Sequence, residues 1–176
     1  YKHQWHVVEA VTALRNQGLP IVLDLVGPAY PPALQRLNAI IDSLDAVQDW
    51  VCYHGAIPFE ELHHHYERAD LGLFASSCEN MPNILLEMMA SGLPIACSDK
   101  EPMPEILGKA GIYFSPEQPE DISNALGKLI ESPLLRMELA QASYDSAQAY
   151  SWQRCANETF SFIAETKKQY NRATNV

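Results

Sequence analysis

Two glutamates, eight residues apart, bracket a segment whose residue types suit a ligand with both phosphate and hydroxyl groups. Glu79 lies in a loop after an apolar run, and Glu87 lies more than one turn inside a helix predicted at 82–91. Proline at the start of that helix leaves the N–H groups of Asn83 and Ile84 free in the first turn. Free N–H groups and the helix dipole attract anions, whereas carboxylates accept hydrogen bonds from hydroxyls. The residues alone fit such a ligand site and an ordinary acidic helix start equally well.

The remaining reactive side chains show no comparable pattern. Three histidines follow one another at 63–65, but successive helical residues point about 100° apart, so the three cannot share one metal ion. The four cysteines, Cys52, Cys78, Cys97 and Cys155, lie too far apart for the usual zinc and redox spacings. We predict reduced, buried thiols at Cys52 and Cys97, with neither a metal nor a cofactor.

Composition is typical of a globular protein. The 176 residues suit one domain, or at most two small ones, and 47% of them are hydrophobic while 19% are charged. The formal net charge of −10 argues against a nucleic-acid partner, because phosphate backbones are bound by a basic face. No apolar run approaches the roughly 18 residues that a membrane span needs.

Strand-like and helix-like segments alternate along the chain. Apolar runs bounded by glycine or proline predict strands at 21–26, 50–54, 71–75, 94–97 and 111–114. Helical spacing predicts helices at 3–17, 32–44, 59–68 and 82–91, from 119 onward, and finally at 151–170. This alternation predicts a doubly wound, Rossmann-like α/β fold with a parallel sheet, whose ligands bind at the carboxyl ends of the strands. A helix opens the chain where such a sheet has a preceding central strand, so we expect a fragment of a longer protein.

The segment around the two glutamates resembles the E-x7-E signature of the retaining glycosyltransferases of family 4, which have the GT-B fold. Further motifs similar to that family's follow in order: Gly27 at a strand end, His54-Gly55-Ala56-Ile57-Pro58 before Glu60-Glu61-Leu62, Tyr66-Glu67-Arg68-Ala69-Asp70, Ala90-Ser91-Gly92-Leu93-Pro94, Pro104-Glu105-Ile106-Leu107 and Tyr150-Ser151-Trp152. Each motif is short, but the ordered set is specific. It matches the C-terminal half of such enzymes, which binds the nucleotide sugar.

The resemblance implies a role for each residue that matches a motif. Glu87 would bind the ribose hydroxyls, and Glu79 would bind hydroxyls of the donor sugar near the reacting carbon. Lys2 would neutralise the diphosphate, on which charge develops as it leaves. The other donor contacts would come from the amides of Asn80, Met81, Asn83 and Ile84, from Gly27, and from the loop of His54, Gly55, Ala56 and Ile57 beside the base.

Two features depart from the family pattern. The family usually has an arginine a few residues before the lysine, and the corresponding position would precede Tyr1. Pro82 stands where many members have glycine, so one amide is lost and the contacts to the sugar are expected to differ.

The resemblance implies the donor-binding half of an enzyme that transfers a sugar from a nucleotide sugar to an acceptor, with retention of configuration and without a metal. Residues 1–150 would form the nucleotide-sugar-binding domain, and 151–176 a helix that crosses to an absent N-terminal, acceptor-binding domain. The acceptor would be a glycan, a polysaccharide or a lipid-linked sugar, in the cytoplasm or at the inner face of the membrane. Only the intact enzyme would touch that membrane. A nucleotide-sugar epimerase of similar fold and a non-catalytic binding module are the alternatives.

The last helix has an apolar side that includes Trp152, Phe160 and Ile163. Trp152 and Ala156 lie four residues apart, so they share a face. We expect these two to dock on the core of the chain, and the part beyond Phe160 to remain unburied because its counterpart lies in the absent half.

Overall fold

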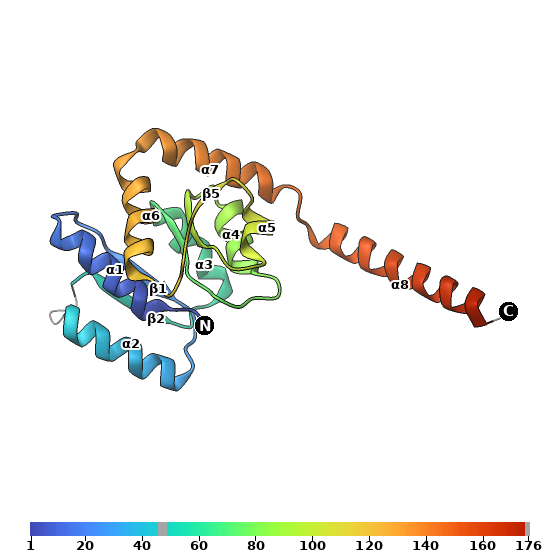
Figure 1. Cartoon of the computed structure of the whole chain (residues 1–176), viewed down its shortest axis with the longest axis horizontal. Helices are drawn as coiled ribbons and strands as arrows, with labels where there is room; N and C mark the ends of the chain where they lie inside the picture. The colour runs from blue at the N-terminus through green and yellow to red at the C-terminus, as the bar shows by residue number, and fades with distance from the viewer. Residues whose placement is uncertain (46–48, 175–176) are drawn as a thin grey trace.

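The computed structural model describes residues 1–45 and 49–174, in which helices and strands alternate as predicted. The strands are β1 (Leu23–Val26), β2 (Val51–Gly55), β3 (Gly72–Phe74), β4 (Ile95–Ser98) and β5 (Gly111–Phe114). The helices are α1 (Gln4–Asn16), α2 (Pro31–Leu44), α3 (Phe59–Arg68), α4 (Asn83–Ala90), α5 (Met103–Leu107), α6 (Pro119–Glu131), α7 (Pro133–Ala147) and α8 (Trp152–Thr174). Figure 1 shows their arrangement.

The described strands form two parallel sheets. β1 pairs with β2, and β3, β4 and β5 pair in that order. The parallel α/β prediction is confirmed, but β1 and β3 are not hydrogen-bonded to each other. In a doubly wound sheet, the strands equivalent to β1 and β3 lie on either side of a central strand. The gap between the two sheets therefore falls where the sequence analysis expects the central strand that would precede α1.

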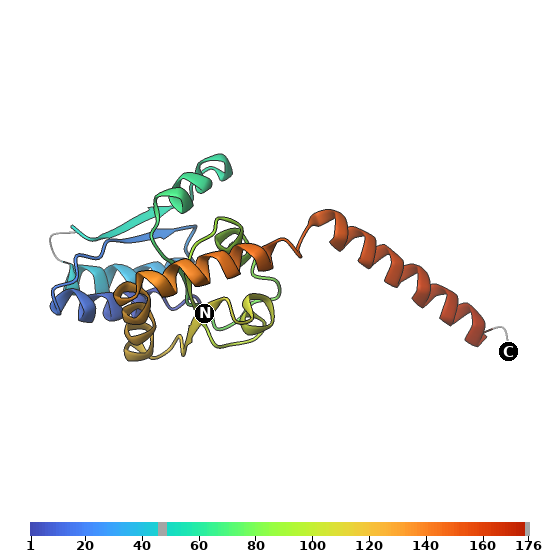
Figure 2. The ribbon, with the colours of Figure 1, turned by 90° about the horizontal axis from the view of Figure 1, so that it is seen from above.

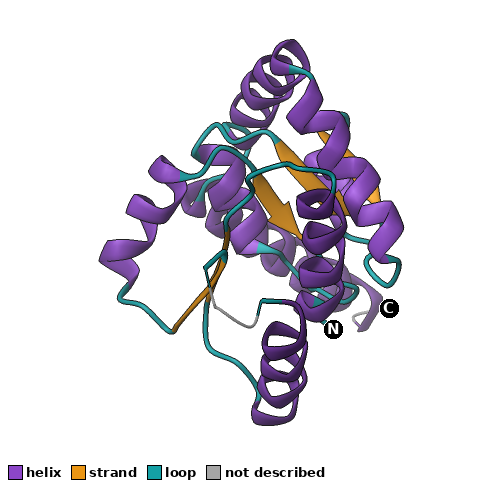
Figure 3. Ribbon diagram, turned by 90° about the vertical axis from the view of Figure 1, so that its left-hand side faces the viewer, coloured by secondary structure: helices purple, strands orange, loops and turns teal. Residues whose placement is uncertain are grey.

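Helices cover both faces of the strands, as Figure 3 shows. Alternate residues of β4 illustrate the two layers, because Ala96 packs into one core and Ile95 and Cys97 pack into the other. The first core collects side chains of α1, α2 and α6, and the second collects side chains of α4, α5 and α7. Cys97 is buried as predicted, whereas Cys52 is only half-buried.

Helix α8 projects away from the rest of the molecule (Figures 1 and 2). Trp152 is 80% exposed, so the prediction that it docks on the core is wrong. Ile163 is exposed, as expected for the part of the helix beyond Phe160, and Phe160 is exposed as well. Residues 150 and 151 lie in the connection between α7 and α8, and the apolar side of the projecting helix (Figure 1) packs on neither core. None of the described helices is both long and apolar enough to cross a membrane.

Candidate functional site

The loop between β3 and α4 carries the first of the two glutamates. Pro82 precedes α4 as its N-cap, so the helix begins one residue later than predicted. The N–H of Asn83 donates to the carbonyl oxygen of Met81 at 2.9 Å, which contradicts the prediction that this group is free. The N–H of Ile84 has no hydrogen-bond partner among the described residues, as predicted. The start of α4 thus offers one free donor of the two expected.

A cavity of about 250 Å³ lies beside this loop and the start of α4. Its lining residues are Lys2, Phe74, Glu79, Met81, Pro82, Asn83 and Ile84. Five of them are residues that the sequence assigned to the donor site. The fold therefore brings the N-terminal lysine, distant in sequence, to the glutamate loop.

Lys2 and Glu79 form an ion pair at this cavity. The Lys2 side chain is 33% exposed and that of Glu79 is 15% exposed, so water screens the pair only in part. The Lys2 Nζ also lies 5.0 Å from the centre of the Phe74 ring, a cation–π geometry. An ammonium group held in this way can meet an anion that enters the cavity.

Glu87 has a different partner. The hydroxyl of Tyr66, on α3, donates a hydrogen bond of 2.9 Å to Glu87 Oε2. Burial raises the pKa of Tyr66, and the hydrogen bond to Glu87 and its negative charge raise the pKa further, so the phenol keeps its proton. Glu87 is half-buried, and its second carboxylate oxygen has no hydrogen bond to a described residue. That oxygen can accept a hydrogen bond from a ligand hydroxyl.

The predicted base-side residues form a second group at the ends of β1 and β2. The Gly27 N–H donates to the Gly55 carbonyl oxygen at 2.8 Å, and both glycines have positive φ, of 126° and 66°. A side chain at either position would strain the backbone, which explains the residue type. His54 Nε2 lies 2.5 Å from Asp24 Oδ1, and its ring packs edge-on against His65. Ala56 is exposed and Ile57 is half-buried in the loop that follows.

The two groups are linked through α3 rather than by direct contact. No hydrogen bond or ion pair among the described residues joins the Gly27–Gly55 group to the cavity at Lys2. Helix α3 begins shortly after the base-side loop, and its Tyr66 reaches Glu87 on α4. Asn80 is exposed in the loop and does not line the cavity.

Two residues at the site were not predicted from the sequence. Phe74 lines the cavity, and Tyr66 holds Glu87. Tyr66 belongs to a motif that was noticed, but its spacing of 21 residues from Glu87 gives no sign of contact. Phe74 ends the strand before the glutamate loop, a position at which ligand contact is common in doubly wound folds.

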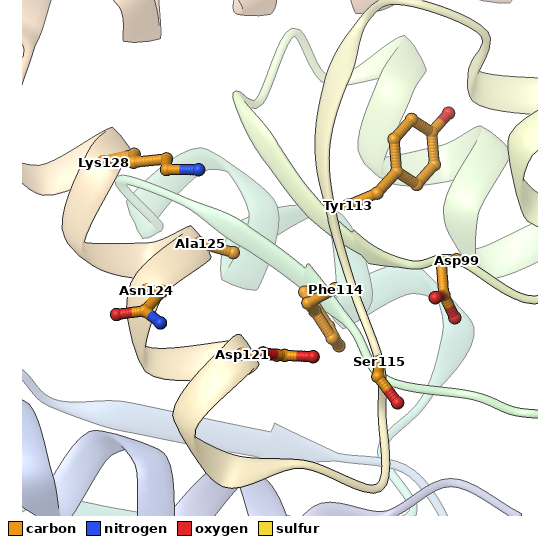
Figure 4. A pocket seen from close by; sticks show the side chains of 8 residues that line it. All are labelled: Asp99, Tyr113, Phe114, Ser115, Asp121, Asn124, Ala125 and Lys128. Carbon is orange, nitrogen blue, oxygen red and sulfur yellow. The ribbon is translucent and has the colours of Figure 1, made fainter.

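A second, larger hollow lies along β5 and α6 and contains none of the predicted site residues. Its volume is about 350 Å³, and Figure 4 shows its lining side chains: Asp99, Tyr113, Phe114, Ser115, Asp121, Asn124, Ala125 and Lys128. Its lining carries two carboxylates and one ammonium group, and of the carboxylates Asp99 is ion-paired with Lys100 at 2.9 Å. A diphosphate is therefore better matched by the smaller cavity at Lys2.

Within residues 1–45 and 49–174, side chains able to bind a metal gather at one exposed place, on α3. Ligand atoms of His63, His64 and Glu67 lie within 4.8 Å of one another, and His65 instead contacts His54. The three adjacent histidines do not all meet, as predicted, but His63 and His64 do come together, although successive helical residues were expected to point apart. All three clustered residues are exposed and none lines the cavity at Lys2.

Comparisons with known proteins identify the class that this fold and site define. The family model "Glycosyl transferases group 1" matches residues 1–132. The chain therefore belongs to the group 1 glycosyltransferases, which is family 4, and it corresponds to the C-terminal domain of their GT-B fold. The family predicted from the motifs is confirmed.

Two curated relatives illustrate the sequence similarity. The O-antigen chain mannosyltransferase B of Escherichia coli is 28% identical over 112 residues, which cover 64% of this chain and 29% of the relative. A D-inositol 3-phosphate glycosyltransferase of Corynebacterium jeikeium is 30% identical over 125 residues, which cover 70% of this chain and 30% of the relative. The chain thus spans less than a third of the length of either protein.

Solved structures share the fold. Sucrose-phosphate synthase from Thermosynechococcus elongatus superposes with a TM-score of 0.79 at 20% identity, over 94% of this chain and 43% of that one. HepE from Anabaena, in complex with UDP and glucose, gives 0.79 at 20% identity over 96% of this chain and 45% of that one. The C-terminal domain of the group 1 glycosyl transferase LpcC from Francisella tularensis gives 0.75 at 23% identity, over 84% and 78%.

Proposed function

We propose that this chain is the donor-binding half of a retaining glycosyltransferase, which transfers a sugar from a nucleoside diphosphate sugar to an acceptor. The observation that carries the proposal is the cavity at which Lys2, Glu79 and the free N–H of Ile84 meet. It offers a cation and a backbone donor for phosphate oxygens, and a carboxylate for sugar hydroxyls. The complex of HepE with UDP and glucose, in a protein of the same fold, supports this choice of ligand.

Each side chain has a separate part in this proposal. Lys2 meets the diphosphate and stabilises the negative charge that develops on it as the bond to the sugar breaks. Glu79 accepts hydrogen bonds from hydroxyls of the donor sugar, and Glu87 accepts them from the ribose. Tyr66 occupies one oxygen of Glu87 and leaves the other for the ligand. The loop of residues 54–57, with Gly27 beside it, faces the base.

The backbone N–H groups proposed to bind the donor differ from those expected from the family resemblance. The Asn83 N–H already donates to Met81, so it is open to a ligand only if that short turn changes. The Ile84 N–H is free and is the donor that we assign to a phosphate oxygen. Because Pro82 has no N–H, the sugar side of the site depends more on the Glu79 carboxylate.

The acceptor lies outside what this chain binds in the proposal. We assign it, a glycan, a polysaccharide or a lipid-linked sugar, to an N-terminal domain that closes over the cavity. Residues 151–176 would form the helix that reaches this domain, and the exposed Trp152 and Phe160 supply its apolar contacts. Transfer needs both substrates in one cleft, and their positioning contributes roughly 7–11 kcal/mol of barrier lowering in favourable cases.

Calorimetry with the 176-residue chain tests the proposal. UDP and GDP should each be titrated, because the base is not assigned, and at least one should bind. The same chain incubated with the matching nucleotide sugar and candidate acceptors should transfer no sugar. Absence of binding by both nucleotides contradicts the donor-half proposal, and measurable transfer by this chain contradicts the assignment of the acceptor to another domain. If a complete enzyme bound the nucleotide sugar without transferring the sugar, a non-catalytic binding module would be favoured. If it converted the nucleotide sugar into an epimer, a nucleotide-sugar epimerase would be favoured.

A further inference from the structure

His3 adopts a backbone conformation that is unusual for its residue type. Its φ of 52° and ψ of 28° place it in the left-handed region, and it is the one described residue other than glycine with a positive φ. The residue is also buried, with only 7% of its surface exposed. A side chain at positive φ is uncommon and persists where surrounding contacts hold it, so the contacts of His3 are informative.

Those contacts lead to a single residue of the glutamate loop. His3 Nε2 and Ser77 Oγ are 2.8 Å apart and form a hydrogen bond. The Ser77 N–H donates to the carbonyl oxygen of Tyr1 at 2.9 Å. Ser77 therefore holds the residue before Lys2 and the residue after it. Glu79, the ion-pair partner of Lys2, follows Ser77 by two positions.

The chemistry of the His3 ring fits a positioning role. Nδ1 is buried and has no partner among the described residues, so Ser77 is the ring's one described polar contact. Burial lowers the pKa of His3, which favours the neutral ring. With the proton on Nε2, the ring donates to Ser77 Oγ, and the hydroxyl can donate to the Tyr1 carbonyl oxygen 3.4 Å away. Stacking on His6, with ring centres 5.4 Å apart, keeps the ring in this orientation.

We propose that His3 and Ser77 are a positioning pair that holds Lys2 against the cavity so that its ammonium group meets the diphosphate of the donor. The inference rests on the function proposed above, because it assumes that Lys2 binds the diphosphate. Neither residue touches the ligand in this account. They act through the backbone on both sides of Lys2. If that backbone moves, the long Lys2 side chain no longer places its ammonium group at the cavity.

A double-mutant cycle separates this role from a merely structural one. Ser77→Ala keeps the N–H that bonds Tyr1 but removes the hydroxyl, and with it the bond from His3 and the longer bond to the Tyr1 carbonyl oxygen. The loosened backbone is expected to weaken binding of UDP or GDP, whichever binds better, roughly 2- to 12-fold. In the background of Lys2→Met, which has no ammonium group to position, the same substitution should change the affinity by less than about twofold. Ser123→Ala, which removes an exposed hydroxyl bonded to the Glu120 carbonyl, is the matched control and should change nothing.

A second pair of variants replaces the ring itself. His3→Gln keeps a nitrogen donor near the position of Nε2 and should preserve the affinity within about twofold, whereas His3→Leu should weaken it as much as Ser77→Ala. Both variants carry the same cost of a side chain at positive φ, so their difference reports the hydrogen bond. This pair also serves if Ser77→Ala does not fold.

The outcomes are distinguishable. Coupling between Ser77 and Lys2, with rescue by glutamine, supports the positioning pair. Equal losses from Ser77→Ala in both backgrounds, no loss in either, or equal behaviour of His3→Gln and His3→Leu overturns it while nucleotide binding itself stands. Failure of the unaltered chain to bind either nucleotide, or full affinity in Lys2→Met, contradicts the proposed function and overturns the positioning role with it.

Discussion

Glutamine at Glu87 should weaken binding of free nucleoside diphosphate, whereas glutamine at Glu79 should not weaken it. Glu87→Gln alters a carboxylate that we assign to the ribose, which the free nucleotide carries. Glu79→Gln alters a carboxylate that we assign to the donor sugar, which the free nucleotide lacks. The two substitutions have the same size and the same change in charge, so the comparison tests position alone.

The loss at Glu87 can be estimated from its contacts. A hydrogen bond to a charged acceptor contributes about 1.5–3 kcal/mol, which corresponds to about 10- to 150-fold in affinity. In Glu87→Gln the amide oxygen would accept from the Tyr66 hydroxyl and turn the NH2 group toward the ligand. That group can still interact with a ribose oxygen, so we expect the low end of the range, about tenfold weaker binding.

The effect at Glu79 follows from its ion pair with Lys2. A partly exposed pair contributes roughly 0.2–1 kcal/mol, which an incoming diphosphate must replace when it takes over the ammonium group. Glu79→Gln removes that competition and one negative charge beside the phosphates. Binding of free nucleoside diphosphate should therefore range from unchanged to about fivefold tighter.

Isothermal titration calorimetry with UDP or GDP measures both variants against the unaltered chain. Glu131→Gln, at an exposed position at the end of α6, controls for the change in net charge. Equal losses in Glu79→Gln and Glu87→Gln, or the larger loss in Glu79→Gln, would refute the assignment of the two roles. A loss in the control as large as that in Glu87→Gln would show that net charge, not contact, sets the affinity.

Three further predictions concern stability. Asp45→Asn should lower the free energy of unfolding by about 1–3 kcal/mol at pH 7, because the carboxylate accepts hydrogen bonds from three backbone N–H groups at residues 49–51. Burial would raise the pKa of Asp45, but these donors outweigh it and hold the pKa below 3.8. In urea titrations, the difference in free energy of unfolding between Asp45→Asn and the unaltered chain should therefore be constant above about pH 4, and it should shrink as the pH falls through the lowered pKa. Gly111→Ala should lower the free energy of unfolding by about 1–3 kcal/mol, since a Cβ there would lie 2.4 Å from the Leu107 side chain. Gly127→Ala in α6 should raise the free energy of unfolding by about 0.5–1 kcal/mol, because its Cβ would meet only Leu14 Cδ2 in ordinary contact at 3.9 Å; stabilisation by Gly111→Ala or destabilisation by Gly127→Ala would refute this packing. Trp152→Ser should leave the Tm unchanged within about 2 °C, and a larger fall would show that the side chain is packed.

Strand and helix positions were predictable because they depend on local pattern. Apolar runs bounded by glycine or proline located all five described strands within about two residues. The division into two sheets was not predicted, because hydrogen bonding between β1 and β3 depends on what lies between them rather than on either strand. Trp152 was misplaced for a related reason. Helical spacing shows that a face is apolar, but not which surface covers it.

At the site, the residue types were predictable but the partners were not. The E-x7-E pattern located Glu79 and Glu87, and the resemblance to the family located Lys2. Nothing in the spacing indicates that Lys2 pairs with Glu79 across 77 positions, or that Tyr66 holds Glu87. Likewise, nothing in the sequence around His3 predicts its left-handed backbone, because that conformation is held by contacts with the glutamate loop.

Local charge, rather than net charge, decides whether an anion can bind here. The chain carries −10 overall, yet at physiological ionic strength charges beyond about 8 Å are largely screened. A diphosphate inside the cavity therefore responds mainly to Lys2, to Glu79 and to the dipole at the start of α4. Without ligand, Glu79 supplies the counter-charge that a partly buried ammonium needs. In the proposed function the diphosphate takes that place, and the freed carboxylate turns to the sugar hydroxyls. Lys2 thus has a negatively charged partner both without ligand, when Glu79 pairs with it, and with ligand, when the diphosphate does. This explains why the fold places Lys2 beside a carboxylate, although its proposed ligand is also an anion.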